Sequence, residues 1–383
     1  MRINWKSSAL SVLATGLIGL AVACGSTGGG SSTTSTPASG AATAATTGGI
    51  ATNIGKDDSA DLTGAGSTFA APIYQSWFDE YRRVAKGVKL NYQGIGSGAG
   101  IQQYTAKTVD FGATDVPMTD AQLQAAPGTQ HIPTVLGAVV VTYNINGVTK
   151  PLRLDGATVA KIYLGDIKKW NDAAVTGLNP GVTLPDAAIQ VVYRSDGSGT
   201  SGVFTDYLSK MSADWKTKVG SATNPNWPVG QGGKGSDGVT QVVKQTPNAI
   251  GYVELTYALG QKLGFADMKN KAGNFVTPTI DTVSAAAAGV TLPADYRVSI
   301  TDADGATAYP VSTFTYIIVP TDAASCAKEK PLVNAFWWAM HDKDAKQIAT
   351  SLFYAPLPEK AQPQVDATLK ALKCEGKAIL PAS

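Results

Sequence analysis

The chain has 383 residues, and its 31 basic and 29 acidic side chains leave a net charge of only +2 at neutral pH. Proteins that bind nucleic acid usually present a strongly basic face, so this balance argues against nucleic acid as a partner. More than three hundred residues follow Lys56, which is enough for two domains of ordinary size.

The N-terminal residues carry the pattern of an export signal. Two basic residues precede an apolar run over residues 9–23, which is too short to span a bilayer and ends in small residues before Cys24. We therefore predict that residues 1–23 are a signal peptide. The sequence Leu-Ala-Val-Ala-Cys at residues 20–24 resembles a bacterial lipoprotein cleavage site, although its leucine stands one position earlier than usual. Lipidation of Cys24 is the prediction, and an ordinary secretory signal with a chance cysteine is the alternative.

A stretch of low complexity follows the signal. Residues 25–55 consist almost wholly of Gly, Ser, Thr and Ala, which cannot bury enough apolar surface to offset the entropy of ordering. We predict that residues 24–56 comprise the lipidated cysteine and a flexible tether. The sequence after residue 56 shows no second apolar segment of membrane-spanning length, so we expect an extracytoplasmic protein that only its lipid anchors to the cell membrane.

Short apolar runs alternate with helical patterns along the rest of the chain. A helical pattern follows a glycine turn at residues 64–66, with Ser67 or Thr68 as its cap. Its apolar positions are Phe69, Ile73, Trp77, Phe78 and Tyr81. The apolar runs predict strands over residues 88–92, 109–113, 138–144, 189–193, 250–254 and 314–319. This alternation predicts an α/β fold with largely parallel sheets.

Two further cysteines and two histidines bear on disulfides and metals. Cys326 and Cys374 form an even pair in an exported chain, which indicates one disulfide, with two buried free thiols as the alternative. His131 and His341 are the only histidines, and neither has neighbours at metal-ligand spacing. We expect no metal and no cofactor.

The segment over residues 193–202 has the composition of an anion cradle. It lies between a predicted strand and a helical pattern over residues 203–211. A turn there directs backbone N–H groups, hydroxyls and the Arg194 guanidinium toward one point. Asp196, two residues further on, can offset the charge of Arg194 and fix its rotamer. Glycine-rich segments at residues 64–69 and 94–100 have the same character.

Catalysis fits the sequence poorly. Neither Ser97 nor Ser198 has the Gly-x-Ser-x-Gly spacing of a nucleophile elbow, and the two histidines offer few partners for a triad. Residues 232–236 resemble a phosphate loop only superficially, because Gly235 rather than Ser or Thr follows the lysine. We predict that the protein is not an enzyme.

Six segments together resemble one known family. They are TGAGSTFAAP (63–72), NYQGIGSG (91–98), DFGATD (110–115), RSDGSGTS (194–201), GGKGSDG (232–238) and GYVE (251–254). In this order they are similar to the phosphate-binding protein of the bacterial high-affinity phosphate transporter of the ATP-binding-cassette class. The resemblance covers nearly all of the chain beyond the tether.

This resemblance implies a two-lobed periplasmic-binding-protein fold of type II-like topology, with a hinge and a ligand cleft between the lobes. Lobe I is expected to comprise residues 57–137 and 310–383, and lobe II residues 138–309. Asp196 is expected to pair with the binding arginine. Ser67 stands where a small residue is expected, and it either adds a hydroxyl or caps a helix, so we leave it out of the site. The implied phosphate contacts are Thr68, Phe69, Ser97, Asp115, Arg194, Ser198, Gly199 and Thr200.

The function implied is high-affinity binding of inorganic phosphate outside the cytoplasm and its delivery, by a monomer, to the permease subunits of an ABC transporter. One alternative is a receptor for another tetrahedral oxyanion, such as sulfate or molybdate. Such a site would require donors only, so the carboxylate of Asp115 distinguishes the two. A phosphate-ester hydrolase with Ser97 or Ser198 as nucleophile is the alternative of another class.

Overall fold

A nine-stranded sheet runs through residues 53–381, the part of the chain that the computed structural model describes. The predicted signal peptide, Cys24 and nearly all of the tether lie outside these residues. Along the sheet the strand order is β2-β1-β3-β12-β4-β8-β6-β7, and β9 pairs with β4. The strands are β1 (Ser59–Gly66), β2 (Gly87–Gly94), β3 (Phe111–Thr114), β4 (Thr129–Asn144), β6 (Gln190–Arg194), β7 (Gln231–Gly233), β8 (Ala249–Glu254), β9 (Gly264–Phe265) and β12 (Ser312–Pro320).

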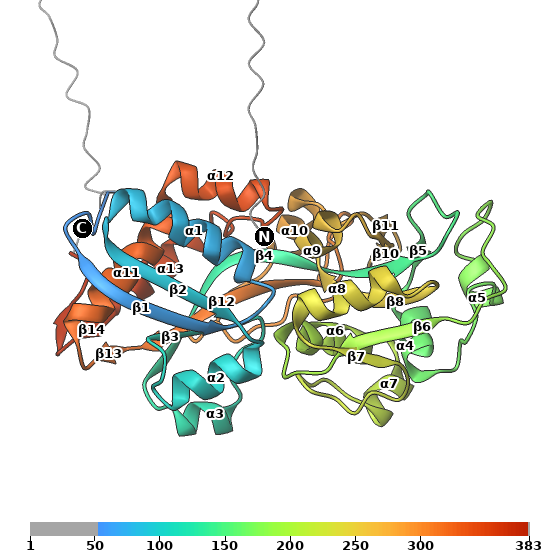
Figure 1. Ribbon diagram of the computed structural model, residues 1–383, viewed down its shortest axis with the longest axis horizontal. Coiled ribbons are helices and arrows are strands. Elements are labelled where there is room, and N and C mark those ends of the chain that lie inside the picture. The colour runs from blue at the N-terminus through green and yellow to red at the C-terminus, as the bar shows by residue number, and fades with distance from the viewer. Residues whose placement is uncertain (1–52, 382–383) are drawn as a thin grey trace, which may run out of the picture. The chain divides into compact units, whose positions relative to one another are not determined.

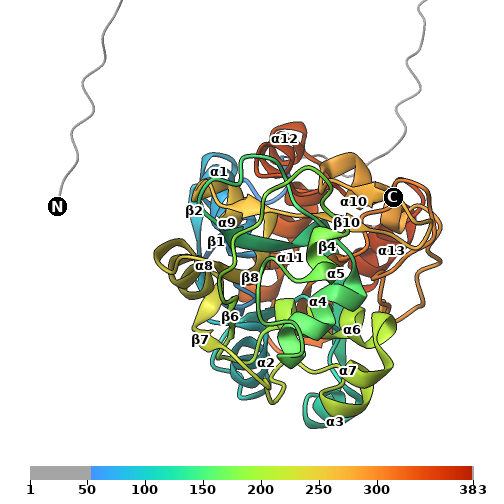
Figure 2. The same cartoon turned by 90° about the vertical axis from the view of Figure 1, so that its right-hand side faces the viewer.

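Strand β4 links two halves of this sheet. Its residues up to Ala138 pair with β12, whereas those from Val139 to Asn144 pair with β8. In Figure 1 the blue and red ends of the chain form the half that contains β1, β2 and β3, and the green and yellow segments form the half that contains β6, β7 and β8. Figure 2 looks onto this second half, with α4 and α5 toward the viewer.

Parallel pairing is confined to the outer parts of the sheet, so the predicted largely parallel arrangement is wrong. β1 is parallel to β2 and β3, and β6 is parallel to β7 and β8. The central pairs β3–β12, β12–β4 and β4–β8 are antiparallel. The reason is that β4 leads the chain into the second half and β12 returns it, so these long central strands run in opposite directions.

Glycines 64 and 66 belong to strand β1, not to the predicted turn. A Cβ atom on Gly64 would lie 2.0 Å from the ring of Phe111, and one on Gly66 would lie 2.0 Å from the carbonyl oxygen of Ala113. These glycines therefore allow β1 to pack closely against β3.

Helices cover both halves of the sheet. The first half carries α1 (Ala71–Val84), α2 (Ser97–Thr105), α3 (Asp120–Ala125), α11 (Cys326–His341), α12 (Lys343–Ser351) and α13 (Gln362–Ala371). The second half carries α4 (Gly156–Leu164), α5 (Ala173–Thr176), α6 (Gly199–Met211), α7 (Ala213–Lys218), α8 (Gly235–Gln245), α9 (Leu255–Gly260) and α10 (Ile280–Ala287). No helix within residues 53–381 is both long and apolar enough to cross a membrane.

The two helices that matter most for the site begin differently. α1 starts at Ala71 behind Ala70, with no side-chain cap, so the predicted cap at Ser67 or Thr68 is wrong. Phe69 consequently precedes the helix. α6 begins at Gly199, and the Ser198 hydroxyl caps it by accepting the N–H of Ser201 at 3.1 Å.

Two small sheets complete the fold. One consists of β5 (Arg153–Leu154), β10 (Asp267–Lys269) and β11 (Phe275–Val276), and the other of β13 (Asp322–Ala323), β14 (Lys373–Cys374) and β15 (Lys377–Ala378). A disulfide joins Cys326 at the start of α11 to Cys374 in β14, in agreement with the predicted pair.

Candidate anion-binding site

The residues predicted to bind the anion lie at the ends of strands and the beginnings of helices. Thr68 and Phe69 lie between β1 and α1, Ser97 opens α2, and Asp115 follows β3 directly. The other contacts come from the second half, where Arg194 ends β6 and residues 198–200 form the cap and first turn of α6. All of these residues are buried.

The carboxylate of Asp115 is the acceptor at the centre of this cluster. Its Oδ1 accepts from the hydroxyls of Ser67 at 2.5 Å and Thr315 at 2.9 Å, and Ser97 Oγ lies 3.5 Å from Oδ2. Burial raises the pKa of Asp115 to about 6, although these hydrogen bonds and the charge of Arg194 act to lower it. Asp115 is therefore mostly ionised at neutral pH.

Arg194 and Asp196 form the buried ion pair that the sequence predicted. Arg194 Nε donates to Asp196 Oδ1 at 2.8 Å and Nη2 donates to Oδ2 at 2.6 Å, in a two-bond fork. The Arg194 side chain is 1% exposed and that of Asp196 is 12% exposed. Burial acts to raise the pKa of Asp196, but the hydrogen bonds and charge of Arg194, together with the Gly235 N–H, outweigh it and lower the pKa.

A pair of hydroxyls, one from each half of the molecule, lies next to the guanidinium of this ion pair. Thr68 Oγ1 and Ser236 Oγ lie 2.8 Å apart, and the Ser236 N–H donates to Thr68 Oγ1 at 3.2 Å. Arg194 Nη1 lies 3.4 Å from Ser236 Oγ, so the guanidinium contacts the Ser236 member of this pair.

The first turn of α6 completes the cluster on the side of Asp115. A Cβ atom on Gly199 would lie 2.6 Å from Asp115 Oδ2, so only glycine permits this approach. Ser198 Oγ accepts from Ser201, which leaves its own proton free to donate. The hydroxyl of Thr200 is buried and contacts no hydrogen-bond partner within residues 53–381.

Three tyrosine hydroxyls fix the backbone that precedes α1. Tyr92 donates to the carbonyl of Ser67 at 2.8 Å, and Tyr257 donates to that of Thr68 at 2.5 Å. Tyr354 donates to the carbonyl of Phe69 at 2.6 Å. With these three carbonyls engaged, the backbone of this segment is held in one orientation.

Several of these positioning groups were absent from the predicted site. The predicted site does not include Ser67, which both donates to Asp115 and accepts the N–H of Ala70 at 3.0 Å. Ser236 belongs to one of the six quoted segments, and that segment was the available signal for it. Thr315, Tyr257 and Tyr354 carry no local motif.

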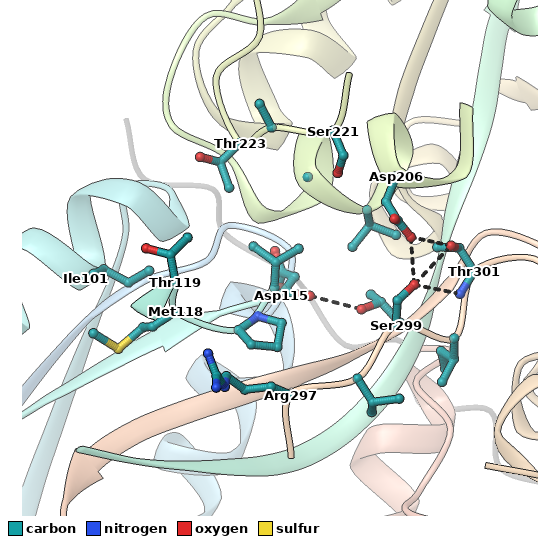
Figure 3. Close-up of a pocket in the computed structure, with 18 of the residues that line it drawn as sticks. Ile101, Asp115, Met118, Thr119, Asp206, Ser221, Thr223, Arg297, Ser299 and Thr301 are labelled. Atoms are coloured by element: carbon teal, nitrogen blue, oxygen red, sulfur yellow. Dashed lines mark hydrogen bonds between the residues drawn. The ribbon is translucent and has the colours of Figure 1, made fainter. Parts of the chain in front are cut away.

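A cavity of about 580 Å³ adjoins the cluster at Asp115. Figure 3 shows Met118 and Thr119 on one side of it and Ser221 and Thr223 on the other. Near its wall, Arg297 pairs with Asp120 of α3 at 2.5 Å and with Asp295 at 2.7 Å. Residues from both halves of the molecule therefore border this cavity.

Comparison with known proteins first defines the class. A family model described as the PBP superfamily domain matches residues 31–343, so the chain belongs to that superfamily. The fold is also shared by a high-affinity periplasmic phosphate-binding protein solved with phosphate (TM-score 0.65, 22% identity, 80% of this chain and 93% of the other). A phosphate-binding protein from Stenotrophomonas maltophilia is similar (TM-score 0.62, 17% identity, 81% and 93%). The predicted two-lobed α/β fold is confirmed.

Closer relatives define the family. The phosphate-binding protein PstS of Xylella fastidiosa is 41% identical over 312 residues, which cover 81% of this chain and 85% of that protein. PstS of Pasteurella multocida is 44% identical over 312 residues, with 81% and 90% covered. The chain belongs to the PstS family of phosphate-binding proteins.

Proposed function

We propose that this protein binds inorganic phosphate in the cleft between its lobes and delivers it to the permease subunits of an ABC transporter. One observation carries the proposal: a buried Arg194–Asp196 pair and a buried carboxylate, Asp115, lie next to hydroxyl groups, with Ser236 beside Arg194 and Ser97 beside Asp115. Donors alone would suit any oxyanion. A partly protonated oxyanion such as phosphate suits donors and one acceptor together.

The lobe boundaries belong to this proposal. We assign residues 57–137 and 310–383 to lobe I and residues 138–309 to lobe II. The change of β4 from pairing with β12 to pairing with β8, between Ala138 and Val139, supports a crossing at that point. The ligand contacts then come from both lobes, and all of them would contact phosphate at the same time only when the lobes close around it.

The proposed contacts are assigned by what each can donate. The Arg194 guanidinium and the hydroxyls of the site donate, as do the N–H groups at the start of α6. Asp115 accepts the proton that phosphate still carries near neutral pH. The full proposed set is Thr68, Phe69, Ser97, Asp115, Arg194, Ser198, Gly199 and Thr200, with Asp196 behind Arg194.

Titration calorimetry with phosphate and sulfate tests the proposal on the wild type and on Asp115→Asn. Sulfate has no proton to give and would meet Asp115 lone pair to lone pair, so the wild type should reject it by about 10⁴-fold or more. The asparagine can donate, so the variant should lose more of its sulfate rejection than of its phosphate affinity. Tight sulfate binding by the wild type would support the receptor for another oxyanion instead.

Hydrolysis of phosphate esters has less support. Ser198 Oγ caps α6, and Ser97 has only a 3.5 Å contact to Asp115. Among residues 53–381, His131 Nε2 accepts from the N–H of Met118 and His341 contacts Asp366, so neither histidine pairs with these serines. Release of chromophore from a chromogenic phosphate ester, lost in Ser97→Ala, would establish the enzyme.

We also propose that Cys24 is lipidated and anchors the protein outside the cytoplasm. The sequence around Cys24 and the glycine-rich segment after it support this assignment. Cys24→Ser should release the protein to the medium or leave it unprocessed. A variant that is processed normally and stays with the membrane would contradict the anchor but not phosphate binding.

A further inference from the structure

The Asp115 carboxylate is held from one side by two hydroxyls that are not among the proposed ligand contacts. Ser67 Oγ and Thr315 Oγ1 both lie within hydrogen-bond distance of the same oxygen, Oδ1, at 2.5 Å and 2.9 Å. Neither Ser67 nor Thr315 is exposed to solvent. Water therefore does not compete with either bond.

The direction of the Ser67 proton is determined by a second contact. Ser67 Oγ accepts the backbone N–H of Ala70 at 3.0 Å, ahead of α1. A serine hydroxyl has one proton, and with its acceptor side engaged by Ala70 that proton is left for Asp115. The loop before α1 and the carboxylate after β3 are thereby joined through one side chain.

Thr315 is held by the sheet. It lies in β12, where it pairs with Val135 of β4, and its carbonyl oxygen accepts from the hydroxyl of Thr134 at 3.2 Å. Its hydroxyl is therefore presented to Asp115 by a strand that pairs with a neighbour on each side, β3 and β4.

These two donors determine which oxygen faces the ligand. A carboxylate rotates about its last bond with little preference, so two donors on one oxygen select an orientation that the side chain itself would not. Oδ2 is left facing Ser97 and the Gly199 turn of α6. Both of these belong to the proposed ligand contacts.

We propose that Ser67 and Thr315 are positioning residues that reserve Asp115 Oδ2 as the acceptor for a protonated oxyanion and so set the selectivity of the site. This inference rests on the proposed binding of phosphate. The two hydrogen bonds also lower the pKa of Asp115, against the effect of burial. They thus keep the carboxylate ionised, and able to accept, at neutral pH.

The test measures the dissociation constants of phosphate and sulfate over a pH series centred on about 6, where Asp115 titrates. Sulfate rejection is the ratio of the sulfate dissociation constant to that of phosphate. In the wild type this ratio should fall as the pH falls through this value, because a protonated Asp115 can donate to sulfate. In Ser67→Ala and in Thr315→Val the midpoint of this loss should move up by about one pH unit.

Matched controls separate positioning from general packing. Ser76→Ala removes a hydroxyl on α1 that donates to the carbonyl of Pro72, and Thr142→Val removes a buried strand hydroxyl that donates to Gly264. Both should keep the wild-type midpoint. Thr315→Ser retains the donor and should also keep it.

Three results would overturn the inference, and they are distinguishable. If Ser67→Ala and Thr315→Val bind phosphate and the pH midpoint of their sulfate rejection is unshifted, the hydroxyls do not act through Asp115. The same follows if the midpoint of Thr315→Ser is displaced as far as that of Thr315→Val. Failure of the wild type to bind phosphate at all would overturn the proposed function, and this inference with it.

Discussion

Asp196→Asn should destabilise the protein strongly in the absence of phosphate, although the two side chains have almost the same shape. Asp196 neutralises Arg194, whose side chain is 1% exposed, through two hydrogen bonds of 2.8 Å and 2.6 Å. Removal of one partner of such a pair leaves a buried, uncompensated charge and costs about 3–5 kcal/mol. At about 2 °C per kcal/mol, the melting temperature should fall by about 6–10 °C.

Asp61→Asn is the matched control, because it breaks the ion pair between Asp61 and Lys89, whose side chains are 82% and 77% exposed. An exposed pair of this kind contributes at most about 1 kcal/mol. Calorimetry of both variants decides the matter, and equal melting temperatures for the two would refute the reasoning.

The pH dependence of the Asp196→Asn effect follows from the lowered pKa of Asp196. A carboxyl whose pKa is lower in the folded state contributes stability above its unfolded pKa and loses it as the pH falls through the folded value. The difference in melting temperature between wild type and Asp196→Asn should therefore be largest at neutral pH and smaller in acid. A difference in melting temperature that grows in acid would contradict the lowered pKa of Asp196.

Three further predictions concern other parts of the molecule. Tyr257→Phe removes the donor to the Thr68 carbonyl and should weaken phosphate binding about tenfold in titration calorimetry, because a buried acceptor is left unpaired; a change below about twofold would contradict this role. Burial, with a smaller effect of a nearby carboxylate, raises the pKa of Glu329 to about 8, so its contribution to stability is complete below its ordinary value of 4.5 and lost as the pH rises to about 8. Glu329→Gln should therefore raise the melting temperature more at about pH 8 than at about pH 4.5, and an equal effect at both would exclude titration of this group. Changing both Cys326 and Cys374 to Ser removes a disulfide whose cysteines are 48 residues apart and should lower the free energy of unfolding by about 4 kcal/mol. Phosphate affinity should not change, because neither α11 nor β14 supplies a site residue. Weakened binding would show that the disulfide affects the site.

Each of the six runs that predicted a strand overlaps a strand of the large sheet, whether its apolar residues are consecutive or alternate with polar ones. The runs over residues 250–254 and 314–319 correspond to β8 and β12 within a few residues. The first part of β4 was missed because Gln130, His131 and Pro133 interrupt its apolar pattern. Pairing with β12 buries that part of the strand nevertheless, so tertiary context overrides the local pattern.

Within the site, separation along the chain determined what could be predicted. Arg194 and Asp196 are two residues apart, and a local turn is sufficient to bring them together. Ser67 and Thr315 lie 48 and 200 residues from Asp115 and meet it only because β1, β3 and β12 are neighbours in the sheet. Strand order across the chain has no signal in local periodicity, so these donors could be found only in the structure.

The buried charges of the proposed site do not favour an anion as such. Arg194 and Asp196 cancel, and Asp115 adds a negative charge near neutral pH, so the three groups together carry a net charge of −1. The attraction for an oxyanion must then come from hydrogen-bond donors, namely the Arg194 guanidinium, the hydroxyls of the site and the N–H groups at the start of α6. Two oxyanions of equal charge interact similarly with these donors. Only an oxyanion that carries a proton can donate a hydrogen bond to Asp115. We therefore expect a site of this composition to distinguish ligands by their protons, and we expect the orientation of the Asp115 carboxylate, held by Ser67 and Thr315, to determine how sharply it does so.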